Sequence, residues 1–229
     1  MKKYYLIGFI LLFPIVGYFF LRSGQNYFRP LPFFGPKHLN GNFHIRKGKK
    51  IPDTVYYTLP PISYENQDHK PITWANFDTN TIFVWNCFYT RSPNIGPRVV
   101  AGMDSLMRQF RIHPDVRFLS LSVDPDYDQA EILKRYISLI HADTTRRWDF
   151  LTGNKEEIYD FVRNSLFLNL YQSKLDSGIN FSPKIVLIDS KHRIRGYYDG
   201  TREEDLKKLR DEIIVLRYKV KRLGQVSGY

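Results

Sequence analysis

The alternation of apolar runs with helical patterns constrains the fold of this chain more than any other feature. Three runs, 81–87 (TIFVWNC), 116–123 (VRFLSLSV) and 184–189 (KIVLID), predict buried strands. Between them, the apolar residues of 99–110 recur with helical spacing, and 155–166 predicts a further helix. Strands that alternate with helices favour an α/β domain, with a central mixed β-sheet flanked by helices.

Shorter patterns extend this domain at both ends. Residues 62–70 predict a strand, a polar turn and a second strand, and 148–153 predict a short strand. The segment 194–198 is expected to form a hairpin with the strand at 184–189. Helices are expected at 131–140 and at 201–223, where one apolar stripe runs along the second of them.

The amino terminus predicts a membrane anchor. Lys2 and Lys3 precede Tyr4–Leu21, a stretch of 18 residues without a charge, which is near the minimum for a bilayer core of about 30 Å. Aromatic residues lie at both ends of the stretch, as suits a membrane interface. We therefore expect residues 1–22 to form an uncleaved signal anchor, a transmembrane helix. A cleaved signal peptide is the alternative, although no A-x-A-like site follows.

The rest of the chain divides into three parts. Pro30, Pro32 and Pro36 exclude a helix, so residues 23–50 are expected to be an extended linker. Within it, Leu31–Pro36 is apolar enough to pack onto the domain. The domain itself is expected at 51–223, followed by a tail at 224–229.

Charge and cysteine content limit the possible functions. The net charge of +11 is compatible with attraction to anionic lipid or nucleic acid, or with an ordinary solvated basic surface. No nucleic-acid-binding signature is present, so no nucleic-acid partner is predicted. Cys87 is the sole cysteine, which excludes an intramolecular disulfide and dithiol exchange.

A loop at 88–97, with the sequence FYTRSPNIGP, joins the strand at 81–87 to the next helix. Ser92 is expected to cap that helix, with Pro93 as its first residue. The loop resembles the F-T-x-C-P-x-x-C-P signature of the SCO/SenC family, which are membrane-anchored, thioredoxin-like copper proteins of the respiratory chain. Tyr89, Thr90, Pro93 and Pro97 match this signature.

Further blocks support the resemblance in the same order along the chain. They are SLSVDPDYD at 120–128, WDFLTG at 148–153 and FSPKIVLIDS at 181–190. The resemblance runs from about residue 53 to 216. It implies a thioredoxin-like fold and a domain on the non-cytoplasmic, periplasmic side of the membrane.

The same resemblance indicates that the copper ligands are missing. In the family, two loop cysteines and a downstream histidine bind copper, and these positions carry Ser92, Gly96 and Phe181 here. Copper(I) prefers soft sulfur ligands, so we expect a degenerate site without catalytic residues, cofactor or metal. The prediction is a non-enzymatic role in binding an unknown protein partner, or in assembly, at the membrane. The alternative is a copper chaperone for respiratory oxidase assembly, using other ligands or ligands that a partner supplies.

Other residues offer weaker candidates for chemistry. His113 and His192 lack neighbours at metal-ligand spacing and are expected in exposed turns. His141 lies two residues from Asp143, but a lone His-x-Asp is a very weak metal signal. Met103 and Cys87 are expected in the core. Asp124 and Asp126 follow a strand end, where they form either a turn or a ligand-facing carboxylate pair.

Overall fold

The computed structural model describes residues 31–46, 48–142, 147–173 and 178–226, together with Leu12 and Tyr18. The chain divides into two compact units, 1–30 and 31–229. Among the described residues, no helix is long and apolar enough to cross a membrane. The predicted anchor lies outside the described residues, apart from Leu12 and Tyr18.

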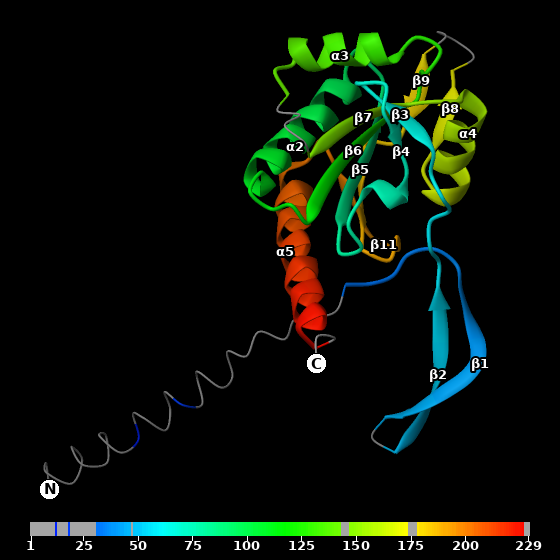
Figure 1. Cartoon of the computed structure of the whole chain (residues 1–229), viewed down its shortest axis with the longest axis vertical. Helices are drawn as coiled ribbons and strands as arrows, with labels where there is room; N and C mark the ends of the chain where they lie inside the picture. The colour runs from blue at the N-terminus through cyan, green and yellow to red at the C-terminus, as the bar shows by residue number, and fades with distance from the viewer. Residues whose placement is uncertain are drawn as a thin grey trace, which may run out of the picture. The chain divides into compact units, whose positions relative to one another are not determined.

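A seven-stranded mixed sheet forms the centre of the second unit, in the order β11-β10-β5-β6-β7-β3-β4 (Figure 1). Strand β5 (Ile82–Phe88) lies inside the sheet and runs parallel to β6 (Val116–Ser122). Strand β7 (Trp148–Thr152) is parallel to β6, whereas β10 (Lys184–Ile188) is antiparallel to β5. The edges are β11 (Ile194–Asp199) on one side, and β3 (Tyr64–Asn66) with β4 (Pro71–Ile72) on the other. The predicted mixed sheet with an interior strand at 81–87 is confirmed.

The predicted helices are present and cover the sheet from both sides. Helices α2 (Ile95–Phe110) and α5 (Glu203–Val226) lie on one side, and α4 (Lys155–Asp160) on the other (Figure 1). The remaining helices are α3 (Ala130–Leu139), the 3-10 turn η1 (Trp74–Asn76) and the π-helical turn η2 (Phe161–Ser165), which continues α4.

Strand β5 separates two hydrophobic cores because its side chains alternate between the faces of the sheet. Phe83 and Trp85 join the core that contains Ile158 of α4. Val84 joins the other core, together with Met103 of α2. This alternation explains why every residue of β5 is buried.

The turn between β3 and β4 has a histidine where a glycine would be easiest. His69 adopts the left-handed conformation, with φ of 57°, which is unfavourable for a residue with a Cβ. Its ring makes hydrogen bonds to Glu65 and, at 2.9 Å, to Glu131 of α3. Glu131 thus ties the turn to α3, and both carboxylates raise the pKa of His69, chiefly through the hydrogen bond that the His69 ring donates to Glu65.

Two small antiparallel sheets lie outside the main sheet. Strands β1 (Lys37–Arg46) and β2 (Lys49–Tyr56) form a hairpin, and β8 (Leu170–Gln172) pairs with β9 (Ile179–Phe181). The sequence did not predict β1, β8 or β9. The segment expected to be a linker, 23–50, therefore includes a strand, and the predicted domain boundary at residue 51 falls within β2.

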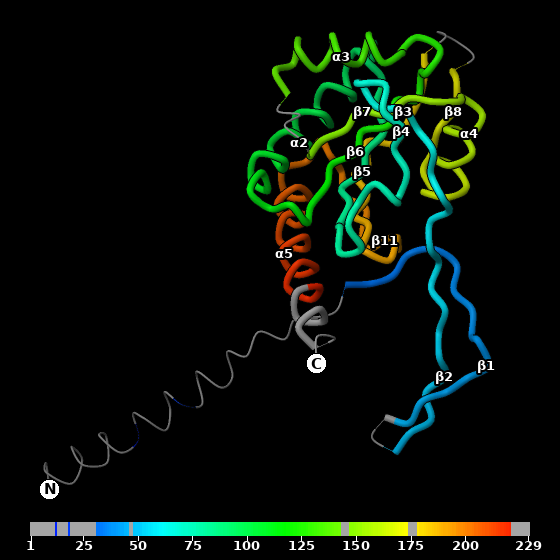
Figure 2. Tube along the Cα trace, in the orientation of Figure 1, coloured from blue at the N-terminus to red at the C-terminus, as the bar shows by residue number. Residues whose placement is uncertain are grey.

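The apolar segment 31–36 packs onto the domain, as the sequence indicated, and then leads into β1 (Figure 2). A buried arginine of β11, Arg195, donates hydrogen bonds to the carbonyl oxygens of Leu31 and, at 2.9 Å, of Pro32. The Arg195 guanidinium also lies 4.0 Å from the ring centre of Phe33. The segment 31–36 is therefore held by the positive charge of Arg195, a residue far from it in the sequence.

Candidate functional site

The structure places two of the three predicted ligand positions, Ser92 and Phe181, at one open pocket, and Gly96 lies next to Ser92. Ser92 is buried, and its Oγ accepts a hydrogen bond of 3.0 Å from the backbone N–H of Gly96. Phe181, at the end of β9, meets the ring of Tyr89 edge to face, with 5.7 Å between ring centres. Ser92, Tyr89 and Phe181 all line a pocket of about 790 Å³.

The helix after this loop starts later than the sequence predicted. Helix α2 begins at Ile95, and Asn94 rather than Ser92 is its cap residue. The Ser92 hydroxyl still satisfies one of the first free N–H groups of the helix, at Gly96. The predicted cap at Ser92 and first residue at Pro93 are therefore wrong by two positions, although the Ser92 hydroxyl does bind an N–H of the first turn.

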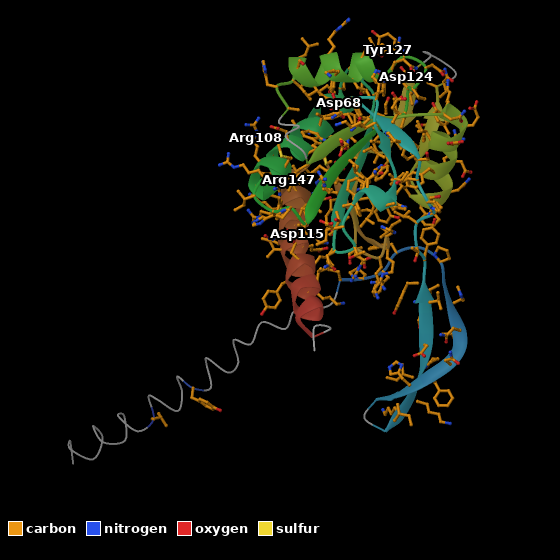
Figure 3. The ribbon with its side chains drawn as sticks, in the orientation of Figure 1. Asp68, Arg108, Asp115, Asp124, Tyr127 and Arg147 are labelled. Atoms are coloured by element: carbon orange, nitrogen blue, oxygen red, sulfur yellow. The ribbon has the colours of Figure 1, made fainter. Side chains whose placement is uncertain are left out.

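Two ion pairs form the rim of the pocket. Arg91 pairs with Asp124 at 2.6 Å, and Lys155 pairs with Asp126 at 2.6 Å. Figure 3 shows Asp124 and Tyr127 close together, and the Arg91 guanidinium lies 4.0 Å from the ring centre of Tyr127. Asp124 and Asp126 therefore each pair with a positively charged side chain, so the rim carries both positive and negative charges.

A buried carboxylate that the sequence analysis did not single out holds the loop at 88–97 through hydrogen bonds. Asp128 is fully buried and accepts hydrogen bonds from the Thr90 N–H at 2.9 Å and the Thr90 hydroxyl at 2.5 Å. The Ser122 hydroxyl also donates to it, at 2.5 Å. Burial raises the pKa of Asp128 even though these hydrogen bonds act against that rise. The sequence signals for this residue are its place six positions after a strand end and its place as the last residue of the block SLSVDPDYD.

The donor groups at the pocket do not suit copper(I). A serine hydroxyl is a hard, poor ligand, and Gly96 and Phe181 offer no side-chain donor at all. The thiol of Cys87 is buried in β5, and this burial raises its pKa to about 12, so the thiolate that a metal requires does not form at neutral pH. Within the described ranges, no group of three or more His, Cys, Asp or Glu side chains is arranged to hold a metal ion.

The remaining candidates are structural in this molecule. Met103 is fully buried in the core, as expected. His192 is half-buried rather than exposed, and its ring stacks on Trp74 with 4.4 Å between ring centres. Burial lowers the pKa of His192. His141 adopts a left-handed turn conformation, whereas its neighbour Asp143 lies outside the described residues.

Comparison with known proteins agrees with this fold. The SCO1/SenC family model matches residues 57–213. A SCO1 protein homolog of Bacillus subtilis (strain 168) is 30% identical over 155 residues, which cover 67% of this chain and 79% of that protein. A SCO1/SenC family lipoprotein from Bacillus anthracis str. Ames has a similar structure. Its TM-score is 0.64 with 25% identity, over 70% of this chain and 95% of that one.

Two further solved structures share the fold at lower identity. BsSco is a member of the Sco family of cytochrome c oxidase assembly proteins. It superposes with a TM-score of 0.62 and 22% identity, over 71% of this chain and 94% of that one. Arabidopsis thaliana ScoI, solved with copper bound, gives 0.57 and 22%, over 74% of this chain and 99% of that one.

These matches show the class of protein to which the domain belongs. The domain has an α/β fold of the thioredoxin-like kind found in Sco proteins. The family model covers more than half of the chain, so this chain belongs to the SCO1/SenC family.

Proposed function

We propose that this chain is a membrane-anchored SCO/SenC protein whose metal site is degenerate, and that it binds a protein partner without acting as an enzyme. The observation that carries this proposal is the chemistry of positions 92, 96 and 181. Ser92 and Phe181 line one pocket and Gly96 contacts Ser92, yet none of the three supplies a soft ligand. The single thiol of the chain lies within the sheet instead.

The shape of the pocket supports partner binding. It is open and lined by two ion pairs and by tyrosine rings, which suits a polar protein loop better than a bare ion. Ile95, at the start of α2, also lines it and is 41% exposed.

Membrane anchoring rests on the uncharged stretch Tyr4–Leu21. The similar protein from Bacillus anthracis is a lipoprotein, but Cys87 of this chain is buried in β5 and so cannot carry a lipid. A transmembrane anchor is therefore the means by which this chain would be held at the membrane, with its domain on the periplasmic side.

A copper titration of the full chain in mild detergent tests the degenerate site. We expect no stoichiometric copper(I) binding in competition with a chelator. The triple variant Ser92→Cys, Gly96→Cys, Phe181→His should gain binding, since it returns two thiolates and an imidazole to one pocket. One tightly bound copper per wild-type chain would refute the proposal and favour a copper chaperone with other ligands.

Site-specific photocrosslinking tests partner binding. A photoreactive amino acid at Ile95 should give a discrete crosslinked product in membranes, because this residue lines the pocket. Ile112 is the matched control, since it is also exposed and lies just past the opposite end of α2, about 25 Å away along the helix. Equal products at both positions, or none at Ile95, would contradict a partner at the pocket.

A further inference from the structure

The β1–β2 hairpin exposes apolar and basic side chains together. Phe43 is 55% exposed and Ile45 is 69% exposed, although both are large apolar residues. Residues 46–50 at its turn have the sequence RKGKK. Arg46 pairs with Lys49 across the turn, where Gly48 has a φ of 74°. The exposed Lys49 and Lys50 therefore place positive charge at this end of the hairpin, together with exposed aliphatic and aromatic side chains.

The pairing of the strands defines an apolar face. Phe43 lies opposite Pro52, and Ile45 lies opposite Lys50. Because directly opposed residues point to the same side of an antiparallel pair, these four side chains share one face. The ammonium group of Lys50 lies 4.6 Å from the ring centre of Phe43. The described part of the chain gives this face no covering element, since the hairpin pairs with no other sheet.

The base of the hairpin, in contrast, is fixed to the domain. The Tyr57 N–H donates to the carbonyl of Pro36 at 3.2 Å, and the ring of Phe33 stacks on that of Tyr56 at 3.9 Å. Phe33 is in turn held against Arg195. The hairpin therefore extends from a rigid base with a solvent-exposed end.

We propose that the end of this hairpin binds an anionic bilayer surface, with Phe43 and Ile45 entering the interface and the basic turn contacting lipid phosphates. Each basic residue near such a surface is attracted to it, and apolar side chains add burial. A second copy of the chain fits the hairpin end poorly, because it would bring the positive charges of two hairpin ends together. Nucleic acid would satisfy the charges but not the exposed Phe43 and Ile45.

The proposal rests on the membrane anchoring that the proposed function includes. If Tyr4–Leu21 spans the bilayer, nine residues, 22–30, separate it from the docked segment at Leu31. A chain of that length reaches at most about 30 Å. The strands of the hairpin have a comparable length, about 30 Å at 3.3 Å per residue, so the end of the hairpin can reach the surface.

A fluorescent label on the full chain in lipid nanodiscs tests the proposal. The label is an environment-sensitive dye on Ile45→Cys, and Ile112→Cys is the control because its exposure, 72%, nearly equals the 69% of Ile45. The buried Cys87 does not compete for the dye. With anionic phosphatidylglycerol in the disc, we expect a blue shift and quenching by brominated lipid at position 45 only. Both effects should be absent in neutral phosphatidylcholine and reversed by high salt.

Charge removal gives a second measurement. Lys49→Gln with Lys50→Gln should lower the ratio of bound to free hairpin about 30-fold, at about fivefold for each lysine. Equal dye spectra at positions 45 and 112 in anionic discs would overturn the proposal. So would a blue shift without quenching by brominated lipid, which indicates a second copy or another protein.

Membrane anchoring is measured separately, by testing whether the chain co-elutes with the nanodisc. Loss of co-elution would refute anchoring, a part of the proposed function. The labelled chain added to preformed anionic vesicles would still report on the hairpin, and quenching there at position 45 alone would support the hairpin proposal by itself.

Discussion

Replacing Arg195 with methionine should destabilise the domain by about 3 kcal/mol. The side chain of Arg195 is 2% exposed and that of its partner Asp189 is 6% exposed, with 2.9 Å between Nη1 and Oδ2. Breaking a buried ion pair from one side typically costs about 3–5 kcal/mol. The lower end of this range applies because Arg193 still donates to Asp189 after the change, at 2.8 Å.

Methionine keeps the aliphatic volume of Arg195. The expected decrease in the free energy of unfolding therefore reports on the lost charge and hydrogen bonds rather than on a cavity. The carbonyls of Leu31 and Pro32 lose their donors, but water can reach this partly exposed segment. Their contribution to the free energy of unfolding is therefore small. The local consequence is larger, because the segment 31–36 loses these two hydrogen bonds to β11 and keeps the one from the Phe34 N–H to the Ile194 carbonyl oxygen, at 3.0 Å.

Urea unfolding of the full chain in mild detergent, followed by tryptophan fluorescence, measures the change. Arg193→Met is the matched control, since its side chain is 23% exposed and binds the same carboxylate, and we expect it to cost about 1 kcal/mol. Limited proteolysis at 31–36 should be accelerated in Arg195→Met only. If the two variants were equally stable and equally resistant to protease, Arg195 would not hold this segment.

Three further outcomes follow from buried groups. Burial opposes ionisation of Asp189, but hydrogen bonds from Arg193 and Arg195 outweigh it and lower its pKa. Its carboxylate therefore stabilises the fold above the unfolded-state pKa of about 4, and this contribution disappears as the pH falls through the lower folded-state value. Urea midpoints measured from pH 7 to 3 should fall less steeply in Asp189→Asn than in the wild type. Gly102→Ala should cost about 1–3 kcal/mol in thermal unfolding, because a Cβ there would lie 2.7 Å from the Gly200 carbonyl oxygen. Ser105→Ala, on the exposed side of α2, should be neutral. Cys87 should react with a thiol reagent only as the domain opens, since its thiol is buried with a pKa near 12; fast reaction in native protein, comparable with that of Ile112→Cys, would contradict its burial.

The main sheet was predictable because its strands bury both faces. A strand such as β5, with Phe83 and Trp85 on one side and Val84 on the other, needs apolar residues at nearly every position. Helix α2 was predictable for a related reason, since only one of its faces is buried and the apolar spacing reveals it. In both cases burial leaves a recognisable pattern of apolar residues in the sequence.

The elements that the sequence did not predict lack such an apolar pattern. Strand β9 has three residues, of which only Phe181 is buried, and β1 is exposed along its described side chains. Their stability comes from cross-strand hydrogen bonds, which leave no periodic pattern. The position of Phe181 at the pocket could be expected only from the family resemblance, not from the residues around it.

The roles of Asp128 and Arg195 were equally hidden. Each lies in a stretch where a charged residue would ordinarily face solvent, and each is buried because of partners distant in the sequence. Asp128 binds Thr90, 38 positions away, and Arg195 binds Pro32, 163 positions away. Such pairings depend on how the elements are arranged in space, so local patterns could not indicate them.

The geometry between positions 92 and 96 indicates how the loop keeps its shape without a ligand. Ser92 Oγ accepts the hydrogen bond from the Gly96 N–H at 3.0 Å, so neither a metal nor a disulfide is needed to close the turn. A Cβ added at Gly96 would lie 2.6 Å from the Ser92 Cβ, whereas the Cβ atoms of a disulfide lie about 3.5–4.5 Å apart. Two cysteines would therefore have to open the loop by about 1 Å against the contacts that Asp124 and Asp128 make with it. The loop is closed around the residues that it now contains, and it presents a charged rim rather than a set of metal ligands.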